Sequence, residues 1–211
     1  KEFIGEEIGI DMGIKDSIVL SNSLKFKAYV EETERLKMLQ RKLMKQIKGS
    51  NNYNKTKNKI RKEYIHISNI KEDISNKIVN SLVTTYDKII TQDDNLNEWK
   101  DNTSKTKSNK GNTIQHSILG RLKYKLQQHS NVIFLDKWFP TTKFCNRCGN
   151  KYDMSDISNR IFECPICNYK EDRDIHAANN MLYFYDKYKP LGTDGSTLVI
   201  CSKILWKDFV A

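Results

Sequence analysis

Four cysteines stand in two pairs, Cys145-Asn-Arg-Cys148 and Cys164-Pro-Ile-Cys167, with fifteen residues between the pairs. Each pair suits a tight turn that directs two thiolates to one centre, and two facing turns give the tetrahedral sulfur set that zinc prefers. Four protein ligands leave no open position for a water molecule, so the spacing predicts one structural zinc and not a catalytic one. Because this segment has few large apolar residues, we expect its fold to depend on the metal.

Carboxylates at the ends of apolar segments form a second candidate group. Asp11 interrupts the apolar residues 8–14, Asp93 and Asp94 follow another apolar segment, and Asp174 opens a helical pattern. An acid inside an apolar strand is unfavourable unless it is exposed, hydrogen-bonded or bound to a cation. Acids from separate strand ends can converge on a pair of divalent cations, which activate water and stabilise the leaving oxygen of a phosphodiester. Carboxylate oxygens favour Mg²⁺ or Mn²⁺, so this pattern is typical of a nuclease.

The elements that would position these groups follow from hydrophobic periodicity. Short apolar segments predict strands at residues 8–14, 17–21, 26–29, 86–94 and 132–136. Apolar residues spaced three and four apart predict a helical hairpin over 30–83, broken at 49–52, and helices over 113–129 and after Asp174. The polar segment 101–112 predicts a mobile loop, and the tail after residue 190 has no readable role.

Charge and cysteine use indicate the class of partner and compartment. The 36 Lys and Arg residues against 26 Asp and Glu give a net charge of +10, which favours a polyanionic partner, nucleic acid first. Basic residues gather near the hairpin turn, where a solvated face and a nucleic-acid contact remain equally consistent. The fifth cysteine, Cys201, has no evident partner, which favours a reducing compartment. No apolar run approaches the roughly 20 residues of a membrane span, so we expect no membrane partner and a cytoplasmic location.

Four motifs occur in a fixed order: IGIDMGIK at 8–15, PTTKFCNRCG at 140–149, CPIC at 164–167 and DRDIHAA at 172–178. Together they resemble the carboxy-terminal half of the TnpB family, which are insertion-sequence-encoded, RNA-guided DNA endonucleases. The resemblance implies an α/β, RNase H-like (RuvC-like) mixed sheet with a helical hairpin insertion and an inserted zinc ribbon. The implied boundaries are 1–143 for the RuvC-like core with its hairpin at about 30–84, 144–170 for the ribbon, 171–189 for the last RuvC-like helix and 190–211 for the tail.

The resemblance also implies roles for the acids. Asp11 is the first catalytic acid and Asp174 the last, whereas the family's middle acid, a Glu, aligns with Gln92, which carries no charge. Side chains at i and i+2 of a strand share a face, so Asp94 is expected to replace that acid, and Asp93 to point away. Asp136, at the end of the next strand, is the second candidate.

The implied function is that of the nuclease portion of an RNA-guided, divalent-metal-dependent DNA endonuclease. Its cofactors would be one structural Zn²⁺ and two catalytic Mg²⁺ or Mn²⁺ ions. Its partners would be DNA and a guide RNA, and the guide RNA would be held through an amino-terminal region that is absent from these residues. In a bacterium it would be associated with the nucleoid. The alternative is a nuclease-inactive, guided repressor, which Gln92 favours and the retained Asp11 and Asp174 oppose. A zinc-ribbon binding module on an unrelated core is a third possibility. The family usually has Asn where this chain has His176.

Overall fold

The computed structural model describes residues 4–101, 116–151, 159–188 and 203–204. Most of the expected loop at 101–112, the start of the helix expected at 113, and the tail apart from 203–204 lie outside these residues. Cys201 lies outside them as well. In the described part, no helix is long and apolar enough to cross a membrane.

Six strands form one mixed sheet in the order β3-β2-β1-β4-β5-β8. They are β1 (Ile4–Asp11), β2 (Ile18–Leu20), β3 (Lys25–Phe26), β4 (Tyr86–Gln92), β5 (Val132–Leu135) and β8 (Lys203–Ile204). Strand β2 pairs antiparallel with both β3 and β1, whereas β1, β4, β5 and β8 run parallel to one another. The expected pairing of the Asp11 strand with the Gln92 strand is confirmed, because Ile10 lies opposite Thr91 in the parallel register. Apolar residues fill both faces of β4, as is usual for a central parallel strand.

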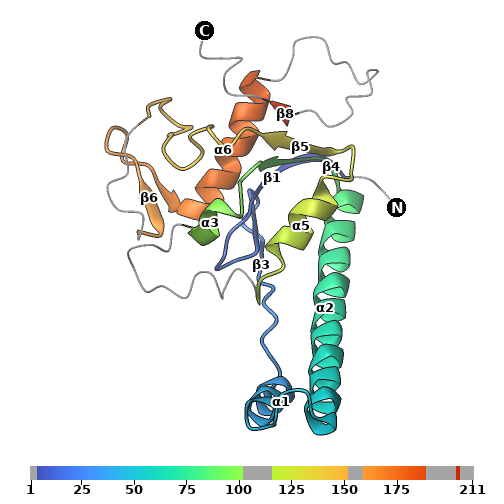
Figure 1. Ribbon diagram of the computed structural model, residues 1–211. Helices are drawn as coiled ribbons and strands as arrows, with labels where there is room; N and C mark the ends of the chain where they lie inside the picture. Colours follow the sequence, from blue (N-terminus) through green and yellow to red (C-terminus); the bar gives the residue numbers. More distant parts are fainter. Residues whose placement is uncertain (1–3, 102–115, 152–158, 189–202, 205–211) are drawn as a thin grey trace.

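The expected helical hairpin consists of α1 (Glu34–Met44) and the long α2 (Asn51–Thr85). Thr33 and Ser50 cap their first turns, each accepting a hydrogen bond from a backbone N–H three residues later. The hairpin extends away from the sheet, with α1 at its far end (Figure 1). A small apolar cluster of its own, including Leu36 and Ile60, joins the two helices.

The other helices of the described residues are α3 (Glu98–Asp101), α5 (Leu119–Leu126) and α6 (Arg173–Tyr188). The single helix expected over 113–129 is wrong in its extent. Ser117 forms a β-bridge with Tyr29, so the chain leaves helical geometry before α5 begins, and α5 ends at Leu126. The third expected strand, 26–29, is likewise reduced to β3 followed by that bridge.

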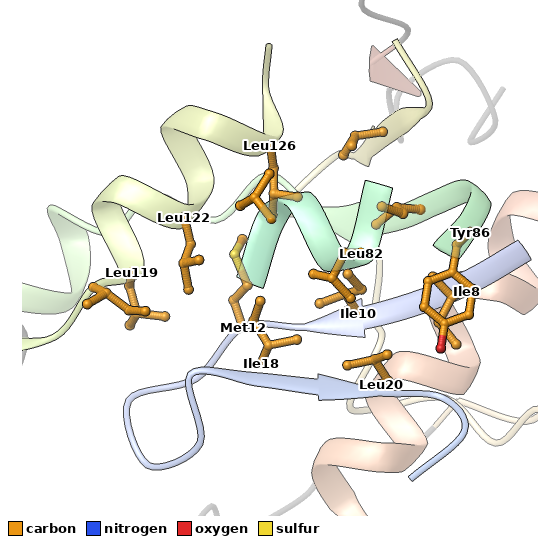
Figure 2. Packing of buried hydrophobic residues seen from close by; sticks show 14 of the residues in the cluster. Ile8, Ile10, Met12, Ile18, Leu20, Leu82, Tyr86, Leu119, Leu122 and Leu126 are labelled. Atoms are coloured by element: carbon orange, nitrogen blue, oxygen red, sulfur yellow. The ribbon is translucent and has the colours of Figure 1, made fainter. Parts of the chain in front are cut away.

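The two faces of the sheet pack against different helices. One face packs against α2 and α5 (Figure 2). On this face, the side chains of Ile8, Ile10 and Met12, from β1 and the residue after it, meet Leu82 and Leu122. The opposite face packs on α6, through a cluster that includes Ile90, Leu135, Met181 and Phe184. Because neighbours along a strand alternate between faces, Gly9 and Asp11 turn toward α6.

Gly9 permits a very close approach of α6. A Cβ atom on Gly9 would lie 2.0 Å from the carbonyl oxygen of Ala178. The contact between Gly9 and Ala178 sets the position of the helix whose first turn carries Asp174.

Candidate active site and metal centre

The four cysteines converge as expected. Cys145 Sγ lies 3.7 Å from Cys167 Sγ, and Cys148 Sγ lies 3.6 Å from Cys164 Sγ. All four sulfurs lie within 4.8 Å of one another. A disulfide needs about 2.05 Å, so these are free thiols. Four sulfurs placed tetrahedrally at ~2.3 Å from a zinc ion would be about 3.8 Å apart, so the four residues fit one Zn²⁺.

Two matching turns place these sulfurs. Gly149 donates its N–H to the carbonyl of Cys145 at 2.8 Å, and Asn168 donates to the carbonyl of Cys164 at 2.9 Å. Both donors adopt the left-handed backbone conformation, with φ of 74° at Gly149 and 56° at Asn168. A short antiparallel pair, β6 (Ile161–Glu163) and β7 (Lys170–Asp172), carries the second turn. The two cysteine turns are therefore built alike and face each other.

Two of the predicted acids lie where the sheet meets α6. Asp11 ends β1, and Asp174 lies in the first turn of α6. Asp94 follows two residues after β4, the strand next to β1. Burial raises the pKa of Asp11 well above its usual range, and the negative charges of Asp174 and Asp94 raise it further. The carboxylates of Asp174 and Asp94 are therefore close enough to Asp11 to disfavour its ionised form, and a cation beside Asp11 would offset that effect.

Asp94 is itself unfavourable as an isolated anion. Burial raises its pKa to about 6, although the nearby ammonium of Lys123 acts in the opposite direction. Asp93 pairs with the same Lys123 at 2.6 Å, and Lys123 Nζ also donates a hydrogen bond to the Asp94 carbonyl oxygen. The side chain of Asp136 caps its own turn, because its Oδ1 accepts the N–H of Trp138 at 3.2 Å. The strongest effects of neighbouring charges on Asp11 come from Asp174 and Asp94.

Arginines hold the Asp174 carboxylate. Arg173 donates to its Oδ1 through Nη2 at 3.2 Å and through Nε at 3.3 Å, and Arg160 lies 3.5 Å from its Oδ2. Among the described residues, the four cysteines form a tight cluster of metal-binding atoms, and the three acids do not gather as closely. The acids offer the hard oxygen donors that suit Mg²⁺ or Mn²⁺, so their chemistry fits such ions.

Asp172 has a role that sequence reasoning missed. Its Oδ1 accepts the N–H groups of Asp174 and Ile175 at 3.0 and 3.3 Å, which makes it the amino-terminal cap of α6. Its Oδ2 pairs with Lys25 of β3 at 2.7 Å. Burial opposes ionisation of Asp172, but Lys25 and the two N–H groups outweigh it and lower its pKa. An aspartate two residues before a helix-opening aspartate is the sequence signal that could have identified this cap.

Two models of known protein families match separate parts of the chain. A family model described as "Probable transposase" matches residues 2–103, which include β1, the helical hairpin and β4. A second model, described as "Cas12f1-like, TNB domain", matches residues 116–181, which include the four cysteines and Asp174.

Three relatives are similar to this chain in sequence. A "Putative RNA-guided DNA endonuclease" of Streptomyces pristinaespiralis is 27% identical over 179 residues, covering 83% of this chain and 44% of that protein. The "Putative RNA-guided DNA endonuclease InsQ" of Escherichia coli (strain K12) is 25% identical over 192 residues, covering 83% and 48%. The "TnpB-like protein L79" of Acanthamoeba polyphaga mimivirus is 29% identical over 137 residues, covering 58% and 24%. The chain belongs to the TnpB family.

This TnpB family member spans about half the length of the first two of these relatives. A solved structure with a similar backbone is described as "Cryo-EM structure of the Cas12f1-sgRNA-target DNA complex". The match has a TM-score of 0.46 and 18% identity, and it covers 82% of this chain and 48% of that one.

Proposed function

We propose that this chain is the nuclease portion of an RNA-guided, divalent-metal-dependent DNA endonuclease. The observation that supports the proposal is the raised pKa of Asp11, which results from burial and from the negative charges of Asp174 and Asp94. A carboxylate is unfavourable in such a place unless a cation accompanies it. Family membership and the strand order β3-β2-β1-β4-β5 support a RuvC-like fold of the RNase H type.

In this proposal the three acids hold the catalytic cations. When bound, Mg²⁺ or Mn²⁺ supplies an activated water and stabilises the leaving oxygen of the phosphodiester. Asp11 is fixed by the sheet, Asp174 by the capped first turn of α6, and Asp94 by the segment that follows β4. Arg173 and Arg160 orient the Asp174 carboxylate. Asp94, and not Gln92 or Asp136, is the third acid.

The second metal in the proposal is one structural zinc. The sulfur spacing of the four cysteines and their matched turns support it, and the segment that they enclose is the zinc ribbon. A site with four protein ligands has no position for a reacting water, so the zinc holds the ribbon together and takes no part in cleavage.

The helical hairpin supplies a surface for nucleic acid. Residues 41–62 contain nine basic side chains and no acidic one. All nine are exposed, and none forms an ion pair in this fully described segment: Arg41, Lys42, Lys45, Lys48, Lys55, Lys57, Lys59, Arg61 and Lys62. An unbalanced basic surface of this kind fits a phosphate backbone better than a merely solvated face, on which both signs of charge alternate. DNA and guide RNA are the proposed partners, and DNA binding would associate a bacterial protein with the nucleoid.

The test is cleavage of DNA by the full-length protein with its RNA and Mg²⁺, compared with the Asp11→Ala variant and with a chelator. The expected result is cleavage by the parent and none by the variant, although both bind nucleic acid. The alternative function is a nuclease-inactive guided repressor, favoured by the neutral Gln92. That alternative is correct if the parent binds its target and never cuts it.

A further inference from the structure

Gln92 lies in the strand position next to Asp11, yet its amide group is fully engaged elsewhere. It is buried, with 7% of its surface exposed. Its Nε2 donates to the carbonyl oxygens of Phe139 at 2.9 Å and Asp136 at 3.2 Å, and its Oε1 accepts from the Thr141 hydroxyl at 2.9 Å. These three bonds fasten the end of β4 to the loop at 136–141, which leads into the first cysteine pair.

The hydrogen bonds continue from this loop to α6. Asn180, which has no exposed surface, donates its Nδ2 to the carbonyl oxygens of Thr141 at 2.6 Å and Phe144 at 2.8 Å. The Phe144 oxygen also lies 2.8 Å from Nε2 of the equally buried His176. Phe144 directly precedes Cys145, so two side chains of α6 hold the peptide that enters the first cysteine turn.

His176 joins the second cysteine turn to the same helix. Its ring stacks on Phe162 of β6 with centroids 3.5 Å apart and planes inclined by 25°. Phe162 has no exposed surface and belongs to the same buried cluster as Cys145 and Cys164. The other ring nitrogen, Nδ1, faces Glu171 of β7 at 3.2 Å. His176 lies two residues after Asp174, so the turn that carries the acid is packed against both cysteine turns.

We propose that Gln92 is a positioning residue. Its neutral amide holds the segment 136–141, which leads into the first cysteine pair, against the end of β4. Through Thr141, Asn180 and His176 the same hydrogen bonds hold the ribbon against the first turn of α6. In this arrangement Gln92 is not a remnant of a lost acid. The cysteine centre and the Asp174 turn form one rigid unit, and Gln92 fastens that unit to β4 beside Asp11.

The chemistry of the site requires an amide. Two carbonyl oxygens face the Nε2 atom, and a carbonyl can only accept hydrogen bonds. Each carbonyl also accepts a backbone N–H, from Phe139 in the case of Asp136 and from Thr141 in the case of Phe139. A carboxylate in the same place would lose both bonds made by Nε2 and set a charged oxygen against the two carbonyl oxygens, at a cost above that of one lost hydrogen bond. Glutamate, the acid that the family resemblance implies for this position, is therefore incompatible with the loop as it is folded here.

The experiment compares Gln92→Glu and Gln92→Met with the parent, because methionine keeps the length of the side chain and removes its hydrogen bonds. Gln128→Glu is the control, since it introduces the same charge at an exposed position. Four quantities are measured in the full chain: the melting temperature, the rate of zinc extraction by a chelator, the affinity for Mn²⁺, and Mg²⁺-dependent cleavage.

Both Gln92 variants should melt about 5–10 °C below the parent, with Gln92→Glu the lower. Zinc extraction should be at least about tenfold faster in both, as for loss of a group that supports a metal site. Mn²⁺ affinity and cleavage should fall in both variants, and the control should match the parent in all four measurements.

Two results would overturn the proposal. Tighter Mn²⁺ binding or faster cleavage by Gln92→Glu would show that an acid at position 92 improves the metal site, and that Gln92 stands in place of a lost catalytic acid. A lower melting temperature with unchanged zinc extraction and Mn²⁺ affinity would show only a local structural role. Of the four measurements, only cleavage depends on the proposed nuclease function. A parent that never cuts refutes the nuclease function, and zinc extraction and Mn²⁺ affinity then still decide the role of Gln92.

Discussion

Replacing Gly9 by alanine should separate α6 from the sheet. The added Cβ would lie 2.0 Å from the Ala178 carbonyl oxygen and 2.9 Å from its carbonyl carbon. Favourable contacts between heavy atoms lie at about 3.5–4.0 Å, so the backbone of α6 must retreat by about 1 Å or more. Overpacking of this kind costs roughly 1–3 kcal/mol, and the upper end applies because backbone atoms cannot rotate away. For a chain of this size, about 3 kcal/mol lowers the melting temperature by roughly 6–12 °C.

The same displacement should reduce cleavage beyond the loss of stability. Asp174 lies one helical turn before Ala178, so a retreat of about 1 Å at Ala178 also moves Asp174 away from Asp11. A misplacement of about 1 Å can cost about 100-fold in rate. The assay is cleavage at a temperature where both proteins are folded, together with calorimetry. Gly120→Ala is the control, because a Cβ there meets nothing within 4 Å. An unchanged melting temperature for Gly9→Ala would refute the direct packing of α6 on β1.

Three further predictions concern the metals and the hairpin. Protein purified without chelators should contain one zinc per chain, and chelation should unfold the cysteine turns while the sheet stays protected from hydrogen exchange; metal analysis that finds no zinc would refute the site. Asp94→Ala should abolish Mg²⁺-dependent cleavage and Asp136→Ala should not, and the reverse result would assign the third acid to β5. Changing Lys57 and Arg61 together to Gln should reduce the slope of log binding constant against log salt by about 1.8, since each phosphate contact contributes about 0.9. Lys77→Gln, on the same helix but paired with Asp73, is the control, and an unchanged slope in the double variant would exclude this surface.

The central strands and the cysteine site could be predicted, because hydrophobic alternation and cysteine spacing within short segments determine them. The strand periodicity of residues 8–14, 86–94 and 132–136 predicted three central strands, and alternation along β4 predicted that Asp93 would turn away from Asp94. The structure confirms the three strands. Asp93 pairs with Lys123, whose charge also acts on Asp94, so the opposite orientation of the two acids stays a prediction. The cysteine spacing similarly predicted four sulfurs around one centre, which the distances bear out.

The network around Gln92 could not be predicted, because its partners lie 44 to 49 residues away in the sequence. No periodicity shows that the loop at 136–141 folds its carbonyl groups back onto the end of β4. The interruption before α5 has a similar cause, since the bridge between Ser117 and Tyr29 is a tertiary contact that overrides helical spacing. Strand β8 lies in the tail, where the sequence has no alternating pattern of sufficient length.

The most direct test of the proposed function is Mg²⁺-dependent cleavage of guide-matched DNA by the full-length protein and its RNA, measured for the parent, Asp11→Ala and Asp174→Ala. The predicted result is that the parent cuts the DNA, and that the cleavage rate is at least about 1,000-fold lower in both variants while nucleic-acid binding is retained. Equal cleavage by all three proteins, or binding without cleavage by the parent, would contradict it.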